Sequence, residues 1–182
     1  MKPYLLVTYN LLRLGWLRLR SRGNFRFSAV QLLGWNTKLS IHPLSRVSLG
    51  RRLVSDGRLV IMTGSGARLT IGDGVYFNEG AMLSCKERLT IGSGCRFGPN
   101  VKVFDNDHKY DAVQGVTADH VTAPVEIGNN CWFGSNVVIL RGSTIGDNCV
   151  IGAGCVVKGN IPDGSLVTMH HGLDVRPIRR KE

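Results

Sequence analysis

An aliphatic or aromatic residue recurs at every sixth position between residues 127 and 157. Neither the 3.6-residue period of a helix nor the two-residue alternation of a strand produces this spacing. A solenoid of short strands does, because each six-residue unit supplies one strand and one turn. The large residues, which we expect to point into the shaft, are Ile127, Phe133, Ile139, Ile145, Ile151 and Val157.

The positions around these large residues support the same interpretation. A mostly small residue stands four places after each one, where it would fill the remaining inner space. Gly-Asx pairs such as Gly72-Asp73, Gly128-Asn129 and Gly146-Asp147 suit tight corners, which Gly and Asn adopt more readily than bulky residues. We therefore predict an all-β solenoid with parallel strands.

The same six-residue phase occurs earlier in the chain and gives the domain organisation. It runs through Ile71, Phe77 and Leu83, slips by two residues, and resumes at Ile91, Phe97 and Val103. Weaker coils without the glycines extend back through Leu59, Leu53, Val47 and Ile41. We predict a basic N-terminal segment at 1–40, a β-solenoid at 41–167 with a loop at about 104–124, and a basic C-terminal tail at 168–182.

Composition limits the classes of function. The 182 residues suffice for one domain, and Lys and Arg outnumber Asp and Glu by 23 to 13. The surplus gathers at both ends of the chain, where it is either a solvated surface or a contact for a phosphorylated ligand or an anionic membrane. No zinc-finger spacing, RNP-like motif or recognition-helix pattern accompanies the charge, so nucleic acid is not expected as a partner.

The five cysteines form no C-x-x-C motif. Cys95, Cys131, Cys149 and Cys155 occupy the small inner position of the repeat, where a buried thiol behaves as a compact hydrophobe. We expect neither a disulfide framework nor a metal site.

The N-terminal run YLLVTYNLLRLGWLRLR is rich in Leu and Arg, too short and too charged to span a bilayer, and lacks a clear cleavage site. It is either a helix that packs on the first coils or an interfacial helix. In the second interpretation, Leu5, Leu12 and Trp16 enter the headgroup region while Arg13, Arg18 and Arg20 face anionic lipid.

The repeat fails between residues 103 and 128, and an interruption of a solenoid is a common place for function. This segment carries His108 and His120, with Asp105, Asp107 and Asp111 nearby. A neutral histidine can accept a proton from a hydroxyl or an amine, and a neighbouring carboxylate or carbonyl can fix its tautomer. The alternative for such a histidine is simple solvation.

Residues 71–162 resemble the hexapeptide-repeat acyltransferases, most closely the branch with galactoside, maltose and nodulation acetyltransferases and envelope-polysaccharide O-acetyltransferases. The matching segments are FNEGAML at 77–83, IGSGCRFGPNVKVFDNDH at 91–108, APVEIGNNCWFGSNVVILRGSTIGDNCVIGAGCVV at 123–157 and NIPDGSLV at 160–167. The resemblance implies a left-handed parallel β-helix, an exception to right-handed crossovers. It also implies a homotrimer with active sites between neighbouring shafts.

The resemblance further implies the roles of individual residues. His108 matches the catalytic histidine that deprotonates the acceptor hydroxyl for direct attack on the thioester of acetyl-CoA, without an acyl-enzyme. Asn78 matches an asparagine beside that histidine, although it could also be a plain corner residue of the coil. Acceptor contacts are expected from Asp107, Tyr76 and His120. Coenzyme contacts are expected from Trp132, Gly134, Ser135 and Ala153.

Two departures from the family pattern concern the coenzyme. Relatives read VVTKDIP where this chain reads VVKGNIP, so Lys158 stands one position before the usual lysine. The family's Gly-Asn-Pro-Ala-Lys-like turn is replaced by residues 169–173 here. The positive charge that a phosphate prefers could come instead from Lys158, Arg176 and Arg180.

The resemblance implies an acetyl-CoA-dependent O-acetyltransferase acting on a sugar hydroxyl, and the basic, leucine-rich N-terminus favours a cell-envelope polysaccharide or its precursor as the acceptor. We expect it in the cytoplasm or peripherally on the inner face of the cytoplasmic membrane. N-acetylation of an amino sugar or sugar nucleotide is the enzymatic alternative, although residues 1–40 are too few for the nucleotide-binding domain of that branch. The non-enzymatic alternative is a non-catalytic β-helix scaffold. Serine acetylation lacks its N-terminal domain, and a γ-class carbonic anhydrase lacks its third histidine.

Overall fold

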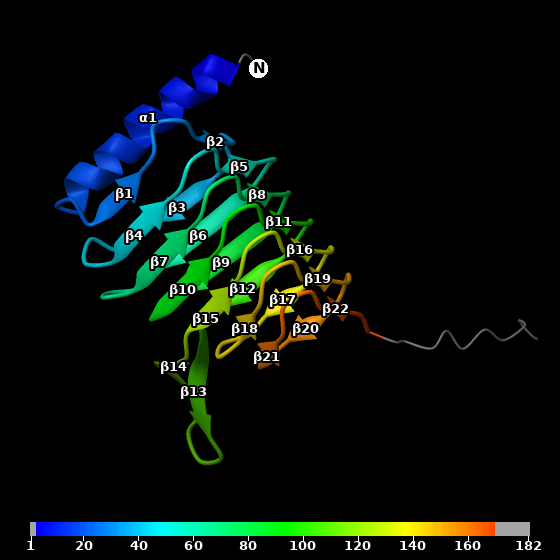
Figure 1. Cartoon of the computed structure of the whole chain (residues 1–182). Coiled ribbons are helices and arrows are strands. Elements are labelled where there is room, and N and C mark those ends of the chain that lie inside the picture. The colour runs from blue at the N-terminus through cyan, green and yellow to red at the C-terminus, as the bar shows by residue number, and fades with distance from the viewer. Residues whose placement is uncertain (1–2, 170–182) are drawn as a thin grey trace, which may run out of the picture.

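The six-residue repeat forms a parallel β-solenoid of about six turns in the computed structural model, which describes residues 3–169 (Figure 1). Three strands and three corners make one coil, and each strand pairs with the strand one coil away. The architecture is the predicted left-handed β-helix, with one N-terminal helix in the described residues.

The strands form the three walls of the solenoid, here called sheets A, B and C. Sheet A contains β1 (Phe25–Phe27), β4 (Arg46–Leu49), β7 (Arg68–Ile71), β10 (Arg88–Ile91), β15 (Val125–Ile127), β18 (Thr144–Ile145) and β21 (Asn160–Ile161). Sheet B contains β2 (Leu32–Leu33), β5 (Val54–Ser55), β8 (Tyr76–Phe77), β11 (Arg96–Phe97), β16 (Trp132–Phe133), β19 (Val150–Ile151) and β22 (Leu166–Val167). Sheet C contains β3 (Lys38–Ser40), β6 (Leu59–Thr63), β9 (Ala81–Cys85), β12 (Lys102–Phe104), β17 (Val138–Ile139) and β20 (Val156–Val157).

The large residues of the repeat fill the shaft, as the pattern predicts. All six between Ile127 and Val157 are at most 3% exposed. Phe97 stacks between Phe77 and Phe133, with ring centroids 4.9 and 4.7 Å apart. The four cysteines predicted at small inner positions are buried, as is Cys85, and all five are free. The core is therefore a set of in-register columns running along the solenoid axis.

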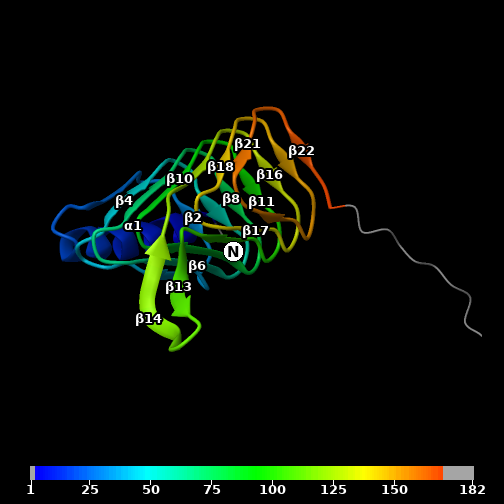
Figure 2. The same ribbon diagram turned by 90° about the horizontal axis from the view of Figure 1, so that it is seen from below.

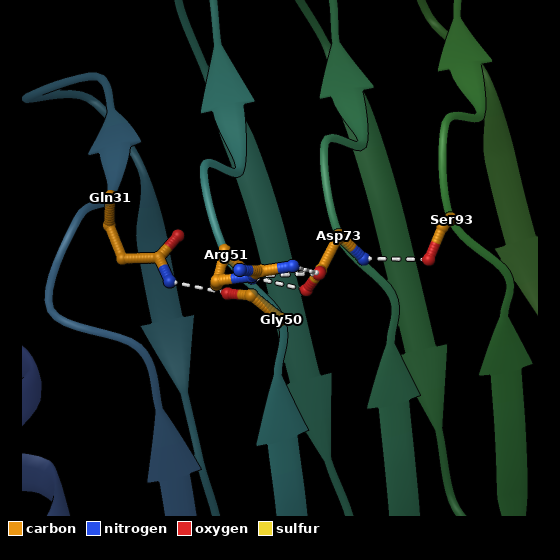
Figure 3. A network of polar contacts seen from close by, with 5 residues as sticks. All are labelled: Gln31, Gly50, Arg51, Asp73 and Ser93. Atoms are coloured by element: carbon orange, nitrogen blue, oxygen red, sulfur yellow. Dashed lines mark hydrogen bonds and ion pairs between the residues drawn. The ribbon is translucent and has the colours of Figure 1, made fainter.

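The corners are held by side chains that take the place of missing backbone partners. At the corner between sheets A and B, Asp73 accepts a hydrogen bond from the backbone N–H of Arg51 at 2.7 Å and pairs with its guanidinium at 2.8 Å (Figure 3). The N–H of Asp73 in turn donates to Ser93 at 3.0 Å. Other corners use Asn in the left-handed region, such as Asn100 with φ 59° and Asn148 with φ 58°.

The helix α1 (Pro3–Arg20) lies across the first coil at the N-terminal end of the shaft (Figure 1). Leu14 and Leu17 are buried against it, and the fully buried Asn10 donates to the carbonyls of Gln31 and Leu33 at 3.3 and 2.9 Å. The chain leaves the helix at Gly23, whose φ of 83° suits glycine. The structure thus shows the packed helix that was one of the two sequence interpretations.

The regular coils begin at Phe25, ahead of residue 41 where the sequence pattern places their start. Strand β1 is already in parallel register with β4, Phe25 opposite Val47. The first coil lacks the pattern because two of its inner positions are polar, Gln31 and Thr37, which are buried at 0% and 7% exposure.

The expected loop at about 104–124 is an antiparallel hairpin of β13 (Asn106–Asp111) and β14 (Gly115–Thr122). It leaves the solenoid between β12 of sheet C and β15 of sheet A and projects away from the shaft (Figure 2). The buried Asp105 fixes its base by accepting from the N–H groups of Lys86 and Glu87, at 2.8 Å each. The hairpin is therefore an ordered arm on a rigid support.

Candidate functional site

The hairpin places His108 on its exposed surface with one ring nitrogen engaged. Nδ1 lies 3.1 Å from the carbonyl oxygen of Thr117 on β14. Because a carbonyl can only accept, Nδ1 carries the hydrogen in the neutral ring and Nε2 keeps its lone pair. The backbone of the hairpin thus fixes the tautomer that can accept a proton at Nε2.

His120 lies directly across the hairpin from His108. The two residues are a register pair of β13 and β14, and their ring centroids are 4.3 Å apart. Desolvation lowers the pKa of His120, and the positive charges of Lys86 and His108 lower it further. The neutral form of His120 is therefore favoured, and a neutral ring can pack against His108 without opposing a positive charge there.

Asp107 neighbours His108 but does not contact its ring. Its Oδ2 accepts a hydrogen bond from Nε of Arg141 at 2.5 Å. Arg141 follows sheet C in the next coil, so the ion pair ties the hairpin to the shaft. Asp107, His108 and Arg141 line an open depression of about 490 Å³ along the hairpin.

A second depression, of about 210 Å³, lies on sheet B. Its lining includes Tyr76, Asn78, Trp132, Gly134 and Ser135, which are five of the residues that the sequence assigns to acceptor or coenzyme. The Trp132 side chain is 53% exposed, so its indole faces outward as expected.

The polar side chains of this depression differ in whether they are free to bind a ligand. Tyr76 donates its hydroxyl to Asp56 at 2.6 Å, and this hydrogen bond raises the pKa of Tyr76. Asn78 uses Oδ1 to accept from the N–H of Glu79 at 2.8 Å. Within residues 3–169, its Nδ2 has no hydrogen-bond partner, so this amide can donate to a ligand.

Gly134 is required by the close approach of neighbouring coils. A Cβ at this position would lie 2.6 Å from the backbone nitrogen of Ala153. The wall of the depression is therefore bare backbone here, which leaves space for a ligand chain. Ala153 and Lys158 are exposed on later coils and do not line the depression, while Arg176 and Arg180 lie outside the described residues.

The sequence analysis missed two arginines. Arg96 lies in register between Tyr76 and Trp132 on sheet B and lines the same depression. It immediately precedes an inward Phe, just as Tyr76 and Trp132 do, so the repeat phase could have identified it. Arg141 could not be found in this way, because only the folded hairpin brings Asp107 to it.

Within one chain, the predicted site residues on the hairpin and the predicted site residues on sheet B lie apart. His108, Asp107 and His120 lie on the arm between sheets C and A. Tyr76, Asn78 and Trp132 belong to sheet B and the corner that follows it. The depression on sheet B and the depression along the hairpin share no lining residue. In the described part of the chain, no group of three or more His, Cys, Asp or Glu is arranged to hold a metal ion.

Comparisons with known proteins agree with this architecture. Residues 124–159 match the bacterial transferase hexapeptide (six repeats) family model. Galactoside O-acetyltransferase of Escherichia coli K12 is 36% identical over 114 residues, covering 63% of this chain and 55% of the relative. The putative lipopolysaccharide biosynthesis O-acetyl transferase WbbJ of the same organism is 30% identical over 145 residues, covering 72% of this chain and 66% of the relative.

A solved structure of AntD, an N-acyltransferase from Bacillus cereus in complex with dTDP and 3-hydroxybutyryl-CoA, superposes with a TM-score of 0.63. It is 16% identical, and the match covers 75% of this chain and 73% of that chain, which supports the fold. The chain spans about half the length of the first curated relatives that it matches.

Proposed function

Because the chain belongs to the hexapeptide-repeat transferases, we propose that it is an acetyl-CoA-dependent O-acetyltransferase acting on a sugar hydroxyl. The observation that carries the proposal is the contact of His108 Nδ1 with the carbonyl of Thr117, which assigns the hydrogen to Nδ1 and leaves Nε2 to accept a proton. The names of the relatives support a galactoside or envelope-glycan acceptor, probed below with a panel of sugars.

In the proposed reaction, Nε2 of His108 takes the proton of the acceptor hydroxyl as its oxygen attacks the carbonyl carbon of acetyl-CoA. The new C–O bond forms and the C–S bond breaks, so the products are the acetyl ester and CoA. The imidazolium then returns its proton to the departing thiolate. No protein thiol takes part, because all five cysteines are buried in the shaft.

Coenzyme contacts are proposed on sheet B. Trp132 offers an exposed aromatic face, and the bare backbone at Gly134, next to Ser135, offers room for the extended pantetheine arm. Ala153 and Lys158 lie further along the shaft, and the exposed ammonium of Lys158 suits a phosphate of the coenzyme.

We further propose that the active site forms between subunits of a homotrimer. The outward residues of sheets B and C include apolar side chains, with Val54, Tyr76 and Trp132 on B and Val60, Met82 and Val138 on C. Arg96 on B and Lys102 on C stand among them. Outward residues of sheet A are polar. Contacts through sheets B and C would bring the arm of one subunit to the depression of its neighbour.

Subunit complementation tests this arrangement. Neither His108→Ala nor Asn78→Ala should support full transfer alone, but mixed trimers should regain part of it if His108 and Asn78 act from different chains. Unmixed trimers of each variant are the control. Sedimentation of the wild-type protein as a monomer, or mixed samples no better than the separate variants, would contradict the proposal.

The membrane contact is also a proposal. No helix within residues 3–169 is long and apolar enough to cross a membrane. One face of α1 nevertheless exposes Leu12, Trp16 and Leu19, at 71%, 56% and 80%. Arg18 and Arg20 border this face, which is the pattern of a helix lying in the interface of an anionic membrane. We propose that it rests on the inner face of the cytoplasmic membrane.

Sedimentation with anionic vesicles tests the membrane contact in the full chain. Leu12→Gln/Leu19→Gln should abolish sedimentation, because the helix keeps its buried face but loses its apolar surface. Leu44→Gln, which removes a leucine that is 65% exposed outside the helix, is the matched control. Equal sedimentation of all three proteins would rule out the contact.

The catalytic proposal is tested by thiol release from acetyl-CoA across free sugars, amino-sugar nucleotides and lipid-linked oligosaccharides, with calorimetric titration of CoA alongside. Wild type should release thiol with a hydroxyl acceptor, and His108→Ala should lose release while still binding CoA. Release with amino sugars alone would favour N-acetylation. No binding of CoA by the wild type would favour the scaffold.

A further inference from the structure

Arginines gather on the outer surface of sheet A near the N-terminal end of the shaft, two of them in one column of neighbouring strands. Arg46 of β4 is in register with Arg68 of β7, and Arg26 of β1 lies opposite Ser48 of β4. Their guanidinium groups face outward, because the alternating neighbours Val47 and Leu69 are buried in the core. Three cations therefore share one small area of the sheet.

This arrangement is electrostatically unfavourable for the protein by itself. Neighbouring strands lie about 4.8 Å apart, and like charges directly opposite each other destabilise a sheet. Arg88, the next member of the column, has an ion pair with Glu126 at 2.9 Å. Among residues 3–169, Arg26, Arg46 and Arg68 have no ion pair and no side-chain hydrogen bond. Their charge is therefore available to an external anion.

The surface around these arginines is hollowed. A depression of about 410 Å³ is lined by all three, by Gly23 and Asn24 at the end of α1, and by the outward hydroxyls of Ser48 and Thr70. Its lining contains no carboxylate. Guanidinium groups bind phosphate oxygens through paired N–H donors, and hydroxyl groups can donate further hydrogen bonds to the same oxygens. The cradle formed by Arg26, Arg46 and Arg68 thus matches a phosphorylated ligand.

The cradle is separate from the proposed catalytic groups but belongs to the same wall as the base of the arm. Strand β15, which follows the hairpin, is three strands along sheet A from β4, or about 14 Å at the usual strand spacing. Sheet A is also the polar wall, so the proposed trimer contacts through sheets B and C leave the cradle open. An extended acceptor could reach from it toward a neighbouring active site.

We propose that Arg26, Arg46 and Arg68 bind the pyrophosphate of an activated glycan, so that the acceptor is a sugar carried on a lipid or nucleotide pyrophosphate. This inference rests on the proposed function for the acceptor, but anion binding itself does not. Two guanidinium groups from neighbouring strands suit the two adjacent phosphates, and the third arginine adds the charge that a pyrophosphate requires.

Calorimetric titration with inorganic pyrophosphate tests the cradle directly. Arg46→Gln/Arg68→Gln should lower its affinity by about tenfold or more, the scale of one lost charge-assisted hydrogen bond. Arg46→Lys/Arg68→Lys should recover part of this loss, because it keeps the charge without the paired donors. Arg88→Gln on the same sheet is the matched control, since Arg88 is already paired with Glu126, and it should change the affinity little.

Acetyl-transfer kinetics then identify the source of the pyrophosphate. The double Gln variant should raise KM about tenfold for a pyrophosphate-bearing glycan. It should leave kcat unchanged, and also KM for the same glycan without pyrophosphate. Separate arms with a nucleotide-linked sugar and a polyprenyl-linked oligosaccharide in detergent show which carrier is used. An equal KM with and without pyrophosphate in the wild type would overturn the proposal for the acceptor.

Two further results would overturn the cradle itself. One is a pyrophosphate affinity that is unchanged in the double Gln variant, or that falls equally in the double Gln variant and in Arg88→Gln. The cradle would then have no effect, or its effect would be only that of the protein's overall positive charge. The other is a changed oligomeric state of the double Gln variant in sedimentation velocity, because sheet A would then be a subunit interface. Failure of the wild type to release thiol with any of the acceptors would contradict the proposed function. The titration would still decide whether the cradle binds pyrophosphate.

Discussion

His108 and His120 are directly paired across the hairpin, with ring centroids 4.3 Å apart and an interplanar angle of 39°. The carbonyl of Thr117 holds Nδ1 of His108, and the ring of His120 covers one side of the same imidazole. A hairpin that projects into solvent can therefore hold a histidine in one tautomer and one orientation. This is the property that a general base requires before its substrate arrives.

The first prediction concerns this pair. His108→Ala should lower kcat by about 10²- to 10⁴-fold, the usual contribution of a general base. His120→Ala should lower it less, by about tenfold, because the hydrogen bond to Thr117 remains while the packing is lost. His42→Ala, a histidine of the first coils, is the control. Equal kcat values for His120→Ala and His42→Ala would show that the ring contact has no part in transfer.

The repeat predicts the core and most of the coils because one inward residue per six is a local rule. It failed at the first coil, where Gln31 occupies an inner position and is 0% exposed. Gln31 is tolerated there because its amide donates to the carbonyl of Gly50 at 2.6 Å (Figure 3). The same amide accepts from the N–H of Leu53 at 3.1 Å. Such compensation depends on the neighbouring coil, which periodicity does not describe.

The site residues also divide into those that the local sequence pattern predicts and those that only the folded chain reveals. The outward position of Trp132 follows from its place beside an inward Phe133, so the sequence could predict it. The contact of Asp107 with Arg141 spans 34 residues and forms only when the hairpin folds back on the shaft. The separation of His108 from Asn78 on different corners likewise depends on how many strands lie between them in a coil.

The second prediction tests the polar core position. Gln31→Leu keeps the size of the side chain but leaves the N–H of Leu53 and the carbonyl of Gly50 without their partner. Each buried group left unpaired costs about 1–3 kcal/mol of the free energy of unfolding. Gln114→Leu, in the exposed turn of the hairpin, should change this free energy little. Denaturant unfolding followed by circular dichroism measures both, and equal values would refute the structural role of Gln31.

The third prediction is a dependence of stability on pH through Asp73. The backbone N–H of Arg51, and next its guanidinium, lower the pKa of Asp73 below the ordinary carboxyl value. Because the folded chain prefers the ionised form, the contribution is fully present above the ordinary carboxyl pKa of about 4 and is lost as the pH falls through the lower folded value.

Thermal unfolding of Asp73→Asn measures this effect. The variant should melt at a lower temperature than the wild type at pH 7, and the difference should shrink as the pH is lowered below about 4. Glu87→Gln removes a carboxylate from an exposed side chain and is the control. A difference in melting temperature that stays constant across the acid range would contradict the assignment to the charge of Asp73.

The fourth prediction concerns the thiols of the shaft. Cys95, Cys131 and Cys149 form one column, each donating to a backbone carbonyl at 3.1 Å. Desolvation raises the pKa of Cys149, so its reactive thiolate is disfavoured. Because all five cysteines are buried, Ellman's reagent should react slowly with the native protein and rapidly with all five after denaturation.

Direct transfer without an acyl-enzyme follows from the same burial. Cys149→Ala should keep acetyl transfer close to the wild-type rate if its fold is intact, because no step requires a protein nucleophile. Its stability should fall, since a buried side chain is shortened in a packed column. Circular dichroism and the oligomeric state serve as controls for folding. An acetylated cysteine trapped by acid quench during turnover would replace direct attack by a covalent route and would require the shaft to open.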